Sequence, residues 1–289
     1  MYYFIKDVYF FIKNFTNLSK SSMPHKRRIM YDFVRISTKA LTRRFFKNKT
    51  AQERIGRFTV SAFDYDAIAF LFGEIFFRGE YFFQARNSSP VILDCGANIG
   101  MATLFFKSLY PECIVYAFEP DIEAFGMLER NVKANDLKDV FVFNCALTDK
   151  NGTIEFYSSQ DNPGSLHMSV HSARINGRKR VVNTLSLASF IKERPLQAVD
   201  FAKIDIEGAE DAVIADLAQT QSLTKIREFA LEYHHKISGQ PSKLSGILRT
   251  LETAGFEYQI DTQVTPISGQ DKFQDIVIRG YRSAVADAV

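Results

Sequence analysis

The chain has 289 residues, of which 46% are hydrophobic and 24% are charged, and its formal net charge is +3. This length and composition are those of one large α/β domain with an extension, able to bury a full core. No apolar run reaches the roughly 20 residues of a membrane-spanning helix. The three cysteines, Cys95, Cys113 and Cys145, have no paired spacing. Their odd number and spacing argue against a disulfide framework and against a zinc site, and we expect a cytoplasmic protein.

Residues 1–50 are expected to form a basic, helical extension in front of a domain over residues 51–289. Apolar side chains near the start recur at helical spacing and predict an amphipathic helix: Phe4, Val8, Phe11 and Phe15. Nine basic residues and one acidic residue, Asp32, follow between His25 and Thr50. This extension could pack on the domain or on a second subunit, or it could contact a membrane surface peripherally. The plainer alternative is a solvated helix face.

Apolar strand-like runs alternate with helical stretches from Val91 onward. Strands are expected over residues 91–95, 115–118, 140–146, 201–206, 228–233, 256–260 and 273–279. Helices are expected over residues 99–110, 122–135, 185–193, 209–217 and 242–254. The stretch 151–182 is polar and turn-rich, and residues 153–157 within it could add a strand or hairpin. This alternation predicts βαβ units and a mostly parallel sheet.

The strongest local signal follows the first of these strands, where the chain reads D-C-G-A-N-I-G from Asp94 to Gly100. Gly96 has no Cβ, so a ligand can approach its backbone. The helix that follows would offer its first N–H groups to a carboxylate or phosphate. In open α/β sheets, nucleotides bind in this first crevice. A glycine-tightened turn without a ligand is the alternative.

Glu119 ends the next expected strand, 25 residues after Asp94. An acidic residue at this point can accept hydrogen bonds from both ribose hydroxyls of a nucleoside. The alternative is a carboxylate at the entry of a helix that begins near Pro120. Because the acid and the glycine loop stand in register across one βαβ unit, nucleoside binding is favoured.

A third signal, K-I-D-I-E-G-A-E, runs from Lys203 to Glu210 at the end of another expected strand. Side chains alternate along a strand, so Lys203, Asp205 and Glu207 would share one side and face the same crevice. Three charges placed there are costly to bury without partners or a function. Mutual salt bridges that also cap the next helix are the alternative.

Five features therefore stand together in this chain: the segment Asp94–Gly100, the pair Glu119-Pro120, Asn131, Asn135 and the string Lys203–Glu210. Together they resemble the FkbM family of S-adenosylmethionine-dependent methyltransferases, over about residues 75–279. The resemblance implies a class I methyltransferase fold, a Rossmann-like, mostly parallel seven-stranded sheet with an antiparallel last strand and helices on both faces. It also implies O-methylation of a hydroxyl on a sugar, glycan or natural product.

The resemblance also implies roles for individual residues toward S-adenosylmethionine. The methionine end of the cofactor would be framed by Asp94, Gly96, Asn98 and Gly100. Glu119 would hold the ribose, and the backbone of Ala146 would lie near the adenine. Asp205 would lie beside the sulfonium and the acceptor.

Methylation of an alcohol also requires removal of its proton, so we expect a general base. The candidates are the strand-end residues Asp205, Glu207, Glu232 and His234. Asp205 and Glu232 could hold a divalent cation, because hard cations prefer carboxylate oxygens. The sequence shows no full ligand set, however, and we expect no metal. A surface histidine is the alternative for His234.

The acceptor pocket is expected to be shaped by the insert 151–182 and by Glu74, Glu80 and Tyr81. Basic residues of the insert could meet an acidic glycan or phosphate, or could be solvated: Arg174, Arg178, Lys179 and Arg180.

Two other functions compete with the methyltransferase. The first is a nucleotide-binding oxidoreductase, which the spacing Cys95–Gly100 disfavours because it is not G-x-G-x-x-G. The second is a non-catalytic binding protein that acts through its basic N-terminal helices at a membrane or on nucleic acid. The sequence carries no aromatic RNA-binding signature, so we expect no nucleic-acid partner.

Overall fold

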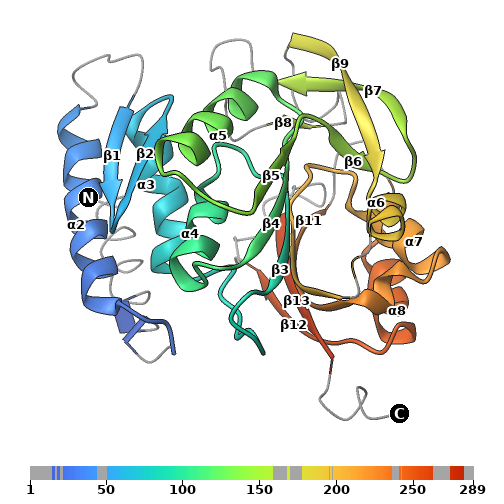
Figure 1. Ribbon diagram of the computed structural model, residues 1–289. Coiled ribbons are helices and arrows are strands. Elements are labelled where there is room, and N and C mark those ends of the chain that lie inside the picture. Colours follow the sequence, from blue (N-terminus) through green and yellow to red (C-terminus); the bar gives the residue numbers. More distant parts are fainter. Residues whose placement is uncertain are drawn as a thin grey trace, which may run out of the picture.

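The computed structural model describes residues 15–16, 18–19, 22–43, 51–158, 168–169, 178–194, 196, 198–235, 241, 243–262 and 274–282. Its centre is a seven-stranded sheet in the order β12-β13-β11-β10-β3-β4-β5 (Figure 1). The strands are β3 (Val91–Cys95), β4 (Ile114–Phe118), β5 (Val140–Phe143), β10 (Val199–Ile204), β11 (Ile226–His235), β12 (Glu257–Thr262) and β13 (Gln274–Tyr281). Strand β13 runs antiparallel to β11 and β12, and the other neighbouring pairs are parallel. The predicted seven-stranded sheet with an antiparallel last strand is confirmed.

Helices cover both faces of this sheet (Figure 1). They are α4 (Met101–Leu109) and α5 (Ile122–Ala134) on one face, and α6 (Leu187–Glu193), α7 (Glu210–Gln219) and α8 (Leu244–Thr253) on the other. Successive strand residues enter different cores: Ile92 packs in the cluster that contains α4, and Leu93 packs with α6 and α7. Burial on both faces explains why the parallel strands read as continuous apolar runs.

Strand β5 ends at Phe143, three residues earlier than the predicted strand over residues 140–146. The side-chain amide of Asn144 donates to the carbonyl oxygens of Glu119 (2.9 Å) and Pro120 (3.2 Å). These bonds turn the chain out of the main sheet directly after Phe143. The following strand, β6 (Ala146–Thr148), belongs to a second sheet instead. The predicted single strand over residues 140–146 is therefore two strands.

The second sheet has the order β6-β9-β7-β8 and is built largely from the polar insert. It adds β7 (Gly152–Ser158), β8 (Met168–Ser169) and β9 (Arg178–Ser186). The predicted extra strand at 153–157 is confirmed as β7, which pairs antiparallel with β9. The helix expected from residue 185 begins two residues later, because Ser186 caps α6 by accepting the N–H of Ser189 at 3.0 Å.

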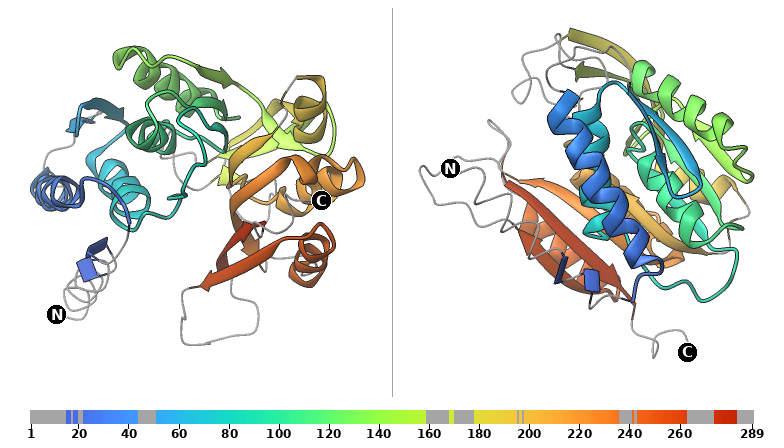
Figure 2. Two further views of the ribbon diagram at one scale, coloured as in Figure 1. Left: turned by 60° about the horizontal axis from the view of Figure 1, so that its bottom comes forward. Right: turned by 90° about the vertical axis from the view of Figure 1, so that its left-hand side faces the viewer.

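The N-terminal part packs outside α4 and α5 (Figure 1 and Figure 2). It consists of α2 (Lys26–Arg43), the hairpin β1 (Ala51–Ile55) and β2 (Phe58–Ala62), α3 (Tyr65–Phe72) and the π-helical turn η1 (Gly73–Phe77). Ile29 and Ile36 of α2 are buried in the same core cluster as Ile92. The Phe33 ring stacks on Phe77 with centroids 4.0 Å apart. Thus α2 shares the core of the rest of the chain, whereas the helix predicted around Phe4, Val8 and Phe11 lies outside the described residues.

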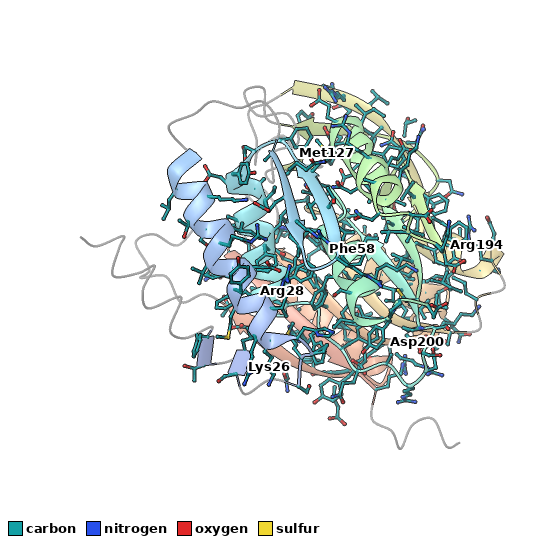
Figure 3. All side chains as sticks on the ribbon, turned by 60° about the vertical axis from the view of Figure 1, so that its left-hand side comes forward. Lys26, Arg28, Phe58, Met127, Arg194 and Asp200 are labelled. Carbon is teal, nitrogen blue, oxygen red and sulfur yellow. The ribbon has the colours of Figure 1, made fainter. Side chains whose placement is uncertain are left out.

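Several basic side chains of α2 bind acids within the protein. Arg35 donates to Asp32 at 2.9 Å and also to Glu53 of the hairpin, and Lys39 donates to Glu53 at 2.7 Å. Asp32 also accepts the N–H of Gly56 at 3.2 Å. Figure 3 shows how α2, the hairpin and α5 follow one another across this side of the molecule. Within the described part of the chain, no helix is both long and apolar enough to cross a membrane.

Two asparagine side chains of α5 form hydrogen bonds with the backbone of β2, in the way that a neighbouring strand would. Asn131 accepts the N–H of Ser61 (2.8 Å) and donates to its carbonyl (2.9 Å). Asn135 makes the same pair of bonds with Thr59, at 2.7 and 2.8 Å. Four residues along a helix and two residues along a strand both advance about 6–7 Å. The two asparagine side chains therefore have the same spacing as the backbone groups of Ser61 and Thr59. Asn131 also donates to the carbonyl of Ile99 (2.8 Å), which ties the hairpin to the loop after β3.

Candidate active site

The loop between β3 and α4 adopts a conformation that depends on its glycines. Gly96, Asn98 and Gly100 have φ angles of 83°, 49° and 88°, in the left-handed region. A Cβ atom on residue 96 would lie 1.8 Å from the carbonyl oxygen of Asp205, and one on residue 100 would lie 2.7 Å from Leu128 Cδ1. Ligand binding at Gly96 stays a prediction, and the structure adds a reason within the protein for glycine at this position. The glycine lets the loops that follow β3 and β10 touch.

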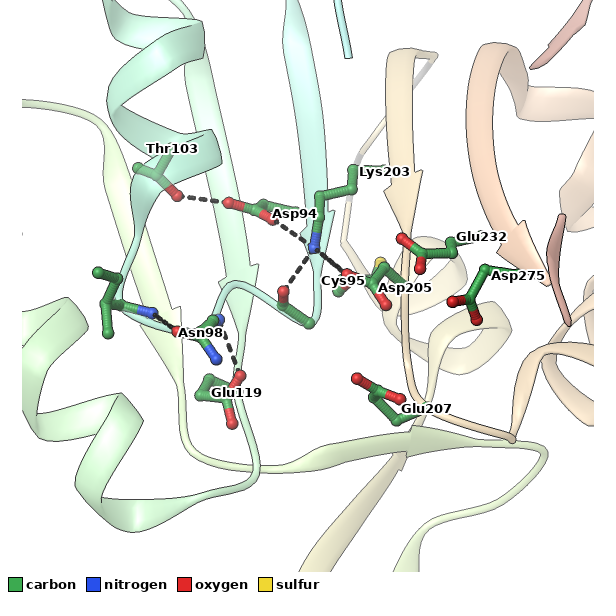
Figure 4. Close-up of polar contacts among 12 residues, drawn as sticks. Asp94, Cys95, Asn98, Thr103, Glu119, Lys203, Asp205, Glu207, Glu232 and Asp275 are labelled. Carbon is green, nitrogen blue, oxygen red and sulfur yellow. Dashed lines mark hydrogen bonds and ion pairs between the residues drawn. The ribbon is translucent and has the colours of Figure 1, made fainter. Parts of the chain in front are cut away.

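Glu119 lies beside this loop, as its position after β4 predicts (Figure 4). Its two carboxylate oxygens accept the N–H groups of Asn98 and Asp121, each at 2.8 Å. Burial raises the pKa of Glu119 to about 8. A carboxylate has about four acceptor positions, so two remain for further donors. The glycine loop and Glu119 are therefore joined by a hydrogen bond at the carboxyl ends of β3 and β4.

Asp94 and Lys203 form a buried ion pair beside the glycine loop. Thr103 donates to Asp94 Oδ2 at 2.6 Å, and Lys203 Nζ lies 3.6 Å from Asp94 Oδ1. Lys203 also donates to the Gly96 carbonyl and lies 3.4 Å from Asp205 Oδ2 (Figure 4). Burial alone would lower the pKa of Lys203, but Asp205 and Asp94 outweigh it and raise that pKa. Lys203 thus connects the glycine loop to the residues after β10.

Asp94 Oδ1 is buried, and its nearest cation, Lys203 Nζ at 3.6 Å, is too far for a hydrogen bond, so this oxygen accepts none within the described part of the chain. An unsatisfied buried carboxylate oxygen is uncommon, and it calls for an explanation such as a donor that is present when the site is loaded. Its position below the glycine loop suits a ligand that carries an amino or ammonium group.

A second group of acidic side chains surrounds His234 on the other side of Lys203. Asp205 and Glu207 follow β10, and Glu232 and His234 lie in β11. Figure 4 shows the carboxylates of Asp205, Glu207, Glu232 and Asp275 gathered around one space. The structure therefore brings the four predicted catalytic residues together. It adds Asp275, which pairs with His234 across β11 and β13.

His234 is buried, so the surface alternative is wrong. Its Nδ1 lies 2.6 Å from Glu210 Oε1, and its Nε2 lies 3.2 Å from Glu207 Oε2. Burial alone would lower the pKa of His234, but Glu210 and Glu207 outweigh it and raise that pKa to about 10. Burial also raises the pKa of Glu232 well above its usual range, and the negative charge of Asp205 raises it further.

The segment before β3 contributes to the same space, as expected for Glu80 and Tyr81. The Tyr81 ring centroid lies 5.4 Å from Lys203 Nζ. Burial raises the pKa of Glu80 to about 8, and the neighbouring charges of Glu74 and Asp205 act in the same direction. Arg279 of β13 donates to the carbonyls of Gly79 (3.0 Å) and Glu80, which holds this segment against the sheet.

Other residues singled out in the sequence lie farther along the second sheet. Ala146 begins β6 and pairs with Thr184 of β9, two residues after the Asn144 turn. Lys179 forms an ion pair with Glu155 (2.5 Å), and Arg180 lies 3.4 Å from Glu123. Arg174 is outside the described residues, and so is the side chain of Arg178.

Residues 94–258, from the glycine loop to β12, match the family model of the methyltransferase FkbM domain. The chain belongs to the FkbM methyltransferase family. This match contains the glycine loop, Glu119 and the string after β10, and it ends before Asp275.

Relatives of this FkbM-family chain include named O-methyltransferases. The 2-O-methyltransferase NoeI of Sinorhizobium fredii (strain NBRC 101917 / NGR234) is 34% identical over 162 residues, which cover 51% of this chain and 65% of that protein. The 31-O-demethyl-FK506 methyltransferase FkbM of Streptomyces tacrolimicus is 28% identical over 214 residues, covering 62% of this chain and 79% of that protein. The crystal structure of methyltransferase FkbM from Methylobacillus flagellatus KT superposes with a TM-score of 0.46 and 18% identity, covering 72% of this chain and 47% of that chain. The chain spans about two thirds of the length of several relatives.

Three residues of this site in the FkbM-family chain were given no role from the sequence. Lys203 and Glu210 stand in the quoted string, and the available signals were the charge of Lys203 on a buried strand and the charge of Glu210 at the start of the next helix. Asp275 had no such signal, because its neighbourhood depends on the register between β11 and β13.

Proposed function

We propose that this chain transfers a methyl group from S-adenosylmethionine to a hydroxyl of a sugar, glycan or natural product. Membership of a methyltransferase family supports the reaction, and the names of NoeI and of the Streptomyces FkbM support oxygen as the acceptor atom. The observation that carries the proposal is the hydrogen bond between the glycine loop and Glu119 at the carboxyl ends of β3 and β4, beside a buried carboxylate oxygen of Asp94 that accepts no hydrogen bond from the described residues.

The residues at these strand ends fit S-adenosylmethionine. Glu119 keeps acceptor positions for ribose hydroxyls, and Asp94 Oδ1 is placed to accept from an amino group. The loop from Gly96 to Gly100 would frame the methionine end, and Ala146 would lie near the adenine. When bound, the cofactor supplies a methyl group on a positively charged sulfur, already activated for transfer.

The acidic group around His234 forms the acceptor side in this proposal. Its residues must align an oxygen, exclude water and remove the hydroxyl proton. Asp205, Glu207, Glu232 and His234 are the candidates for this proton transfer, and all four contact the same space. Asp205 is our first choice, because it adjoins both the acidic group and Lys203 below the glycine loop.

Ligand binding by the full chain tests the cofactor assignment. S-adenosylhomocysteine should bind in calorimetry and raise the melting temperature, whereas NAD should do neither. Glu119→Ala should weaken that binding at least tenfold. Incubation with S-adenosylmethionine and a panel of sugar and polyketide alcohols should then give a product one methyl group heavier. Absence of S-adenosylhomocysteine binding would overturn the proposal.

A further inference from the structure

We propose that Asp205, Glu207 and His234 form a binding site for one divalent transition-metal ion, with Glu232 and Asp275 facing it. Neither the family match nor the relatives assign such a site to this chain. The proposal concerns ion binding, which can be measured without cofactor or acceptor.

The first argument is the geometry around one nitrogen atom. His234 Nε2 lies 3.2 Å from Glu207 Oε2, 3.9 Å from Glu232 Oε1, 3.9 Å from Asp275 Oδ1 and 4.0 Å from Asp205 Oδ1. Metal bonds of about 2.0–2.2 Å place neighbouring ligand atoms roughly 3.0–3.5 Å apart and opposite ones about 4.2 Å apart. The separation to Glu207 matches that of neighbouring ligands, and the other three lie between the neighbouring and the opposite values, so a small inward shift of these side chains would let them share an ion.

The second argument is the way His234 is held. Its Nδ1 lies 2.6 Å from Glu210 Oε1, and both side chains are only 1% exposed. Glu210 in turn accepts the N–H of Gly208 at 2.9 Å. A carboxylate on the far nitrogen orients a metal-binding histidine and increases its basicity. Here this arrangement directs Nε2 toward the carboxylates, so a buried polar nitrogen points into the proposed site.

The third argument separates two overlapping triads. The donor atoms of Asp205, Glu207 and His234 lie within 4.8 Å of one another, and so do those of Glu232, His234 and Asp275. In the first triad the carboxylates are 24% and 20% exposed, whereas Asp275 is 51% exposed. Asp205 and Glu207 also come from one loop, which is tied to β3 by the bond from Asp205 N–H to the Cys95 carbonyl at 3.1 Å. The first triad is therefore better shielded from solvent.

The donor set indicates the class of ion. Imidazole favours zinc, iron and related transition ions, and carboxylates favour manganese and magnesium. One imidazole with two or more carboxylates suits Mn²⁺ or Zn²⁺ better than Ca²⁺. If the proposed methyl transfer is correct, an ion here would also lower the pKa of an acceptor hydroxyl bound to it. That role depends on the proposed function, but binding of the ion does not.

The test is titration of the chelator-treated full chain with Mn²⁺ alone, followed by calorimetry and by electron paramagnetic resonance of the bound ion. We expect one Mn²⁺ per chain. Glu207→Gln and His234→Gln should each weaken binding at least tenfold, and Glu210→Gln should weaken it about 10- to 100-fold. Asp275→Asn should weaken it less than Glu207→Gln. Glu155→Gln, a carboxylate change on the second sheet, is the matched control and should leave binding unchanged.

Three results would overturn the proposal: no Mn²⁺ or Zn²⁺ binding by the wild-type chain, equal binding by Glu207→Gln, or a larger loss in Asp275→Asn than in Glu207→Gln. Circular dichroism is the check that each variant is folded, and Glu207 is exposed enough to accept glutamine. S-adenosylhomocysteine binding is measured on the same samples. If it is retained while Mn²⁺ fails to bind, the metal site is wrong and the proposed function stands; the converse result rejects the proposed function alone.

Discussion

The carbonyl oxygen of Asp205 lies 1.8 Å from the point that a Cβ atom on residue 96 would occupy. Asp205 also donates its N–H to the Cys95 carbonyl at 3.1 Å, and Lys203 donates to the Gly96 carbonyl. The loops after β3 and β10 are thus in direct backbone contact. Because the proposed cofactor and acceptor sides lie on these two loops, any displacement of one loop moves both sides of the site.

Gly96→Ala is expected to damage binding and stability together. The new methyl group must push the Asp205 backbone away, and a φ of 83° is unfavourable for alanine. We expect a loss of at least tenfold in S-adenosylhomocysteine affinity and at least about 2 kcal/mol in the free energy of unfolding. Calorimetry and urea denaturation measure the two effects.

Gly126→Ala is the matched control for that substitution. Gly126 lies within the exposed face of α5, and a Cβ atom there would meet nothing within 4 Å. Alanine should increase the free energy of unfolding by about 0.5–1 kcal/mol, because glycine is a poor helix former. Equal losses in the two variants would show that contact with Asp205 is not the cause.

Asn131→Asp should separate hairpin docking from the rest of the fold. Aspartate keeps the acceptor for Ser61 N–H but loses the donors to the Ser61 and Ile99 carbonyls, and it adds a buried charge. We expect a loss of roughly 2–4 kcal/mol in the free energy of unfolding and weaker S-adenosylhomocysteine binding. Asn135→Asp, which also loses its hairpin donor but has no bond to the Ile99 loop, should leave that binding unchanged.

Lys203→Met should be strongly destabilising, because it leaves Asp94 buried without its cation. Removal of one partner from a buried ion pair costs about 3–5 kcal/mol. Asp94→Asn in the same chain should recover part of this loss, since the uncompensated charge then disappears. Urea denaturation of the two single variants and the double variant measures the coupling. Additive losses would contradict the interaction, which the structure places at 3.6 Å.

Glu119 should make stability depend on pH in an unusual direction. Its pKa of about 8 in the folded chain exceeds the ordinary value of 4.5, because burial disfavours the charged form. Between these two values the folded chain retains a proton that the unfolded chain loses, so this group reduces stability as pH rises. Glu119→Gln should therefore gain stability relative to wild type from pH 5 to pH 8. Urea denaturation at several pH values gives the difference, and a constant difference would contradict it.

The affinity for S-adenosylhomocysteine should change in the opposite sense. Ribose hydroxyls that donate to Glu119 favour its ionised form, so binding releases a proton below pH 8. Affinity should rise with pH up to about 8, by less than tenfold per unit, and then level off. The slope should be smaller in Glu119→Gln. An identical slope in both proteins would remove Glu119 from the binding site.

The main sheet could be predicted because each strand carries its own local signal. The apolar run at Val91–Cys95 is buried on both faces, and glycine or acidic residues mark the strand ends. The break after Phe143 could not be predicted in the same way, because it depends on the bonds from Asn144 to a distant loop. Strand β9 was missed because its polar run, Arg178–Asn183, is supported by pairing with β7 and not by its own pattern.

The candidate site also contains residues that a local sequence pattern predicts and residues that depend on distant contacts. Asp94, Gly96 and Glu119 could be placed from spacing within one βαβ unit. The neighbours of His234 could be placed only in part, since Glu207 and Glu210 are close in sequence to β10 whereas Asp275 comes from the last strand. Contacts set by the register of distant strands have no counterpart in a local motif.

The asparagine pair on α5 has a consequence for self-association. An unpaired strand edge is a template on which foreign strands can assemble. The edge of β2 opposite β1 is instead closed at Ser61 and Thr59 by the amides of Asn131 and Asn135. A helix thereby blocks strand addition at a hairpin on the outside of the molecule, and aggregation through this edge would first require α5 to detach.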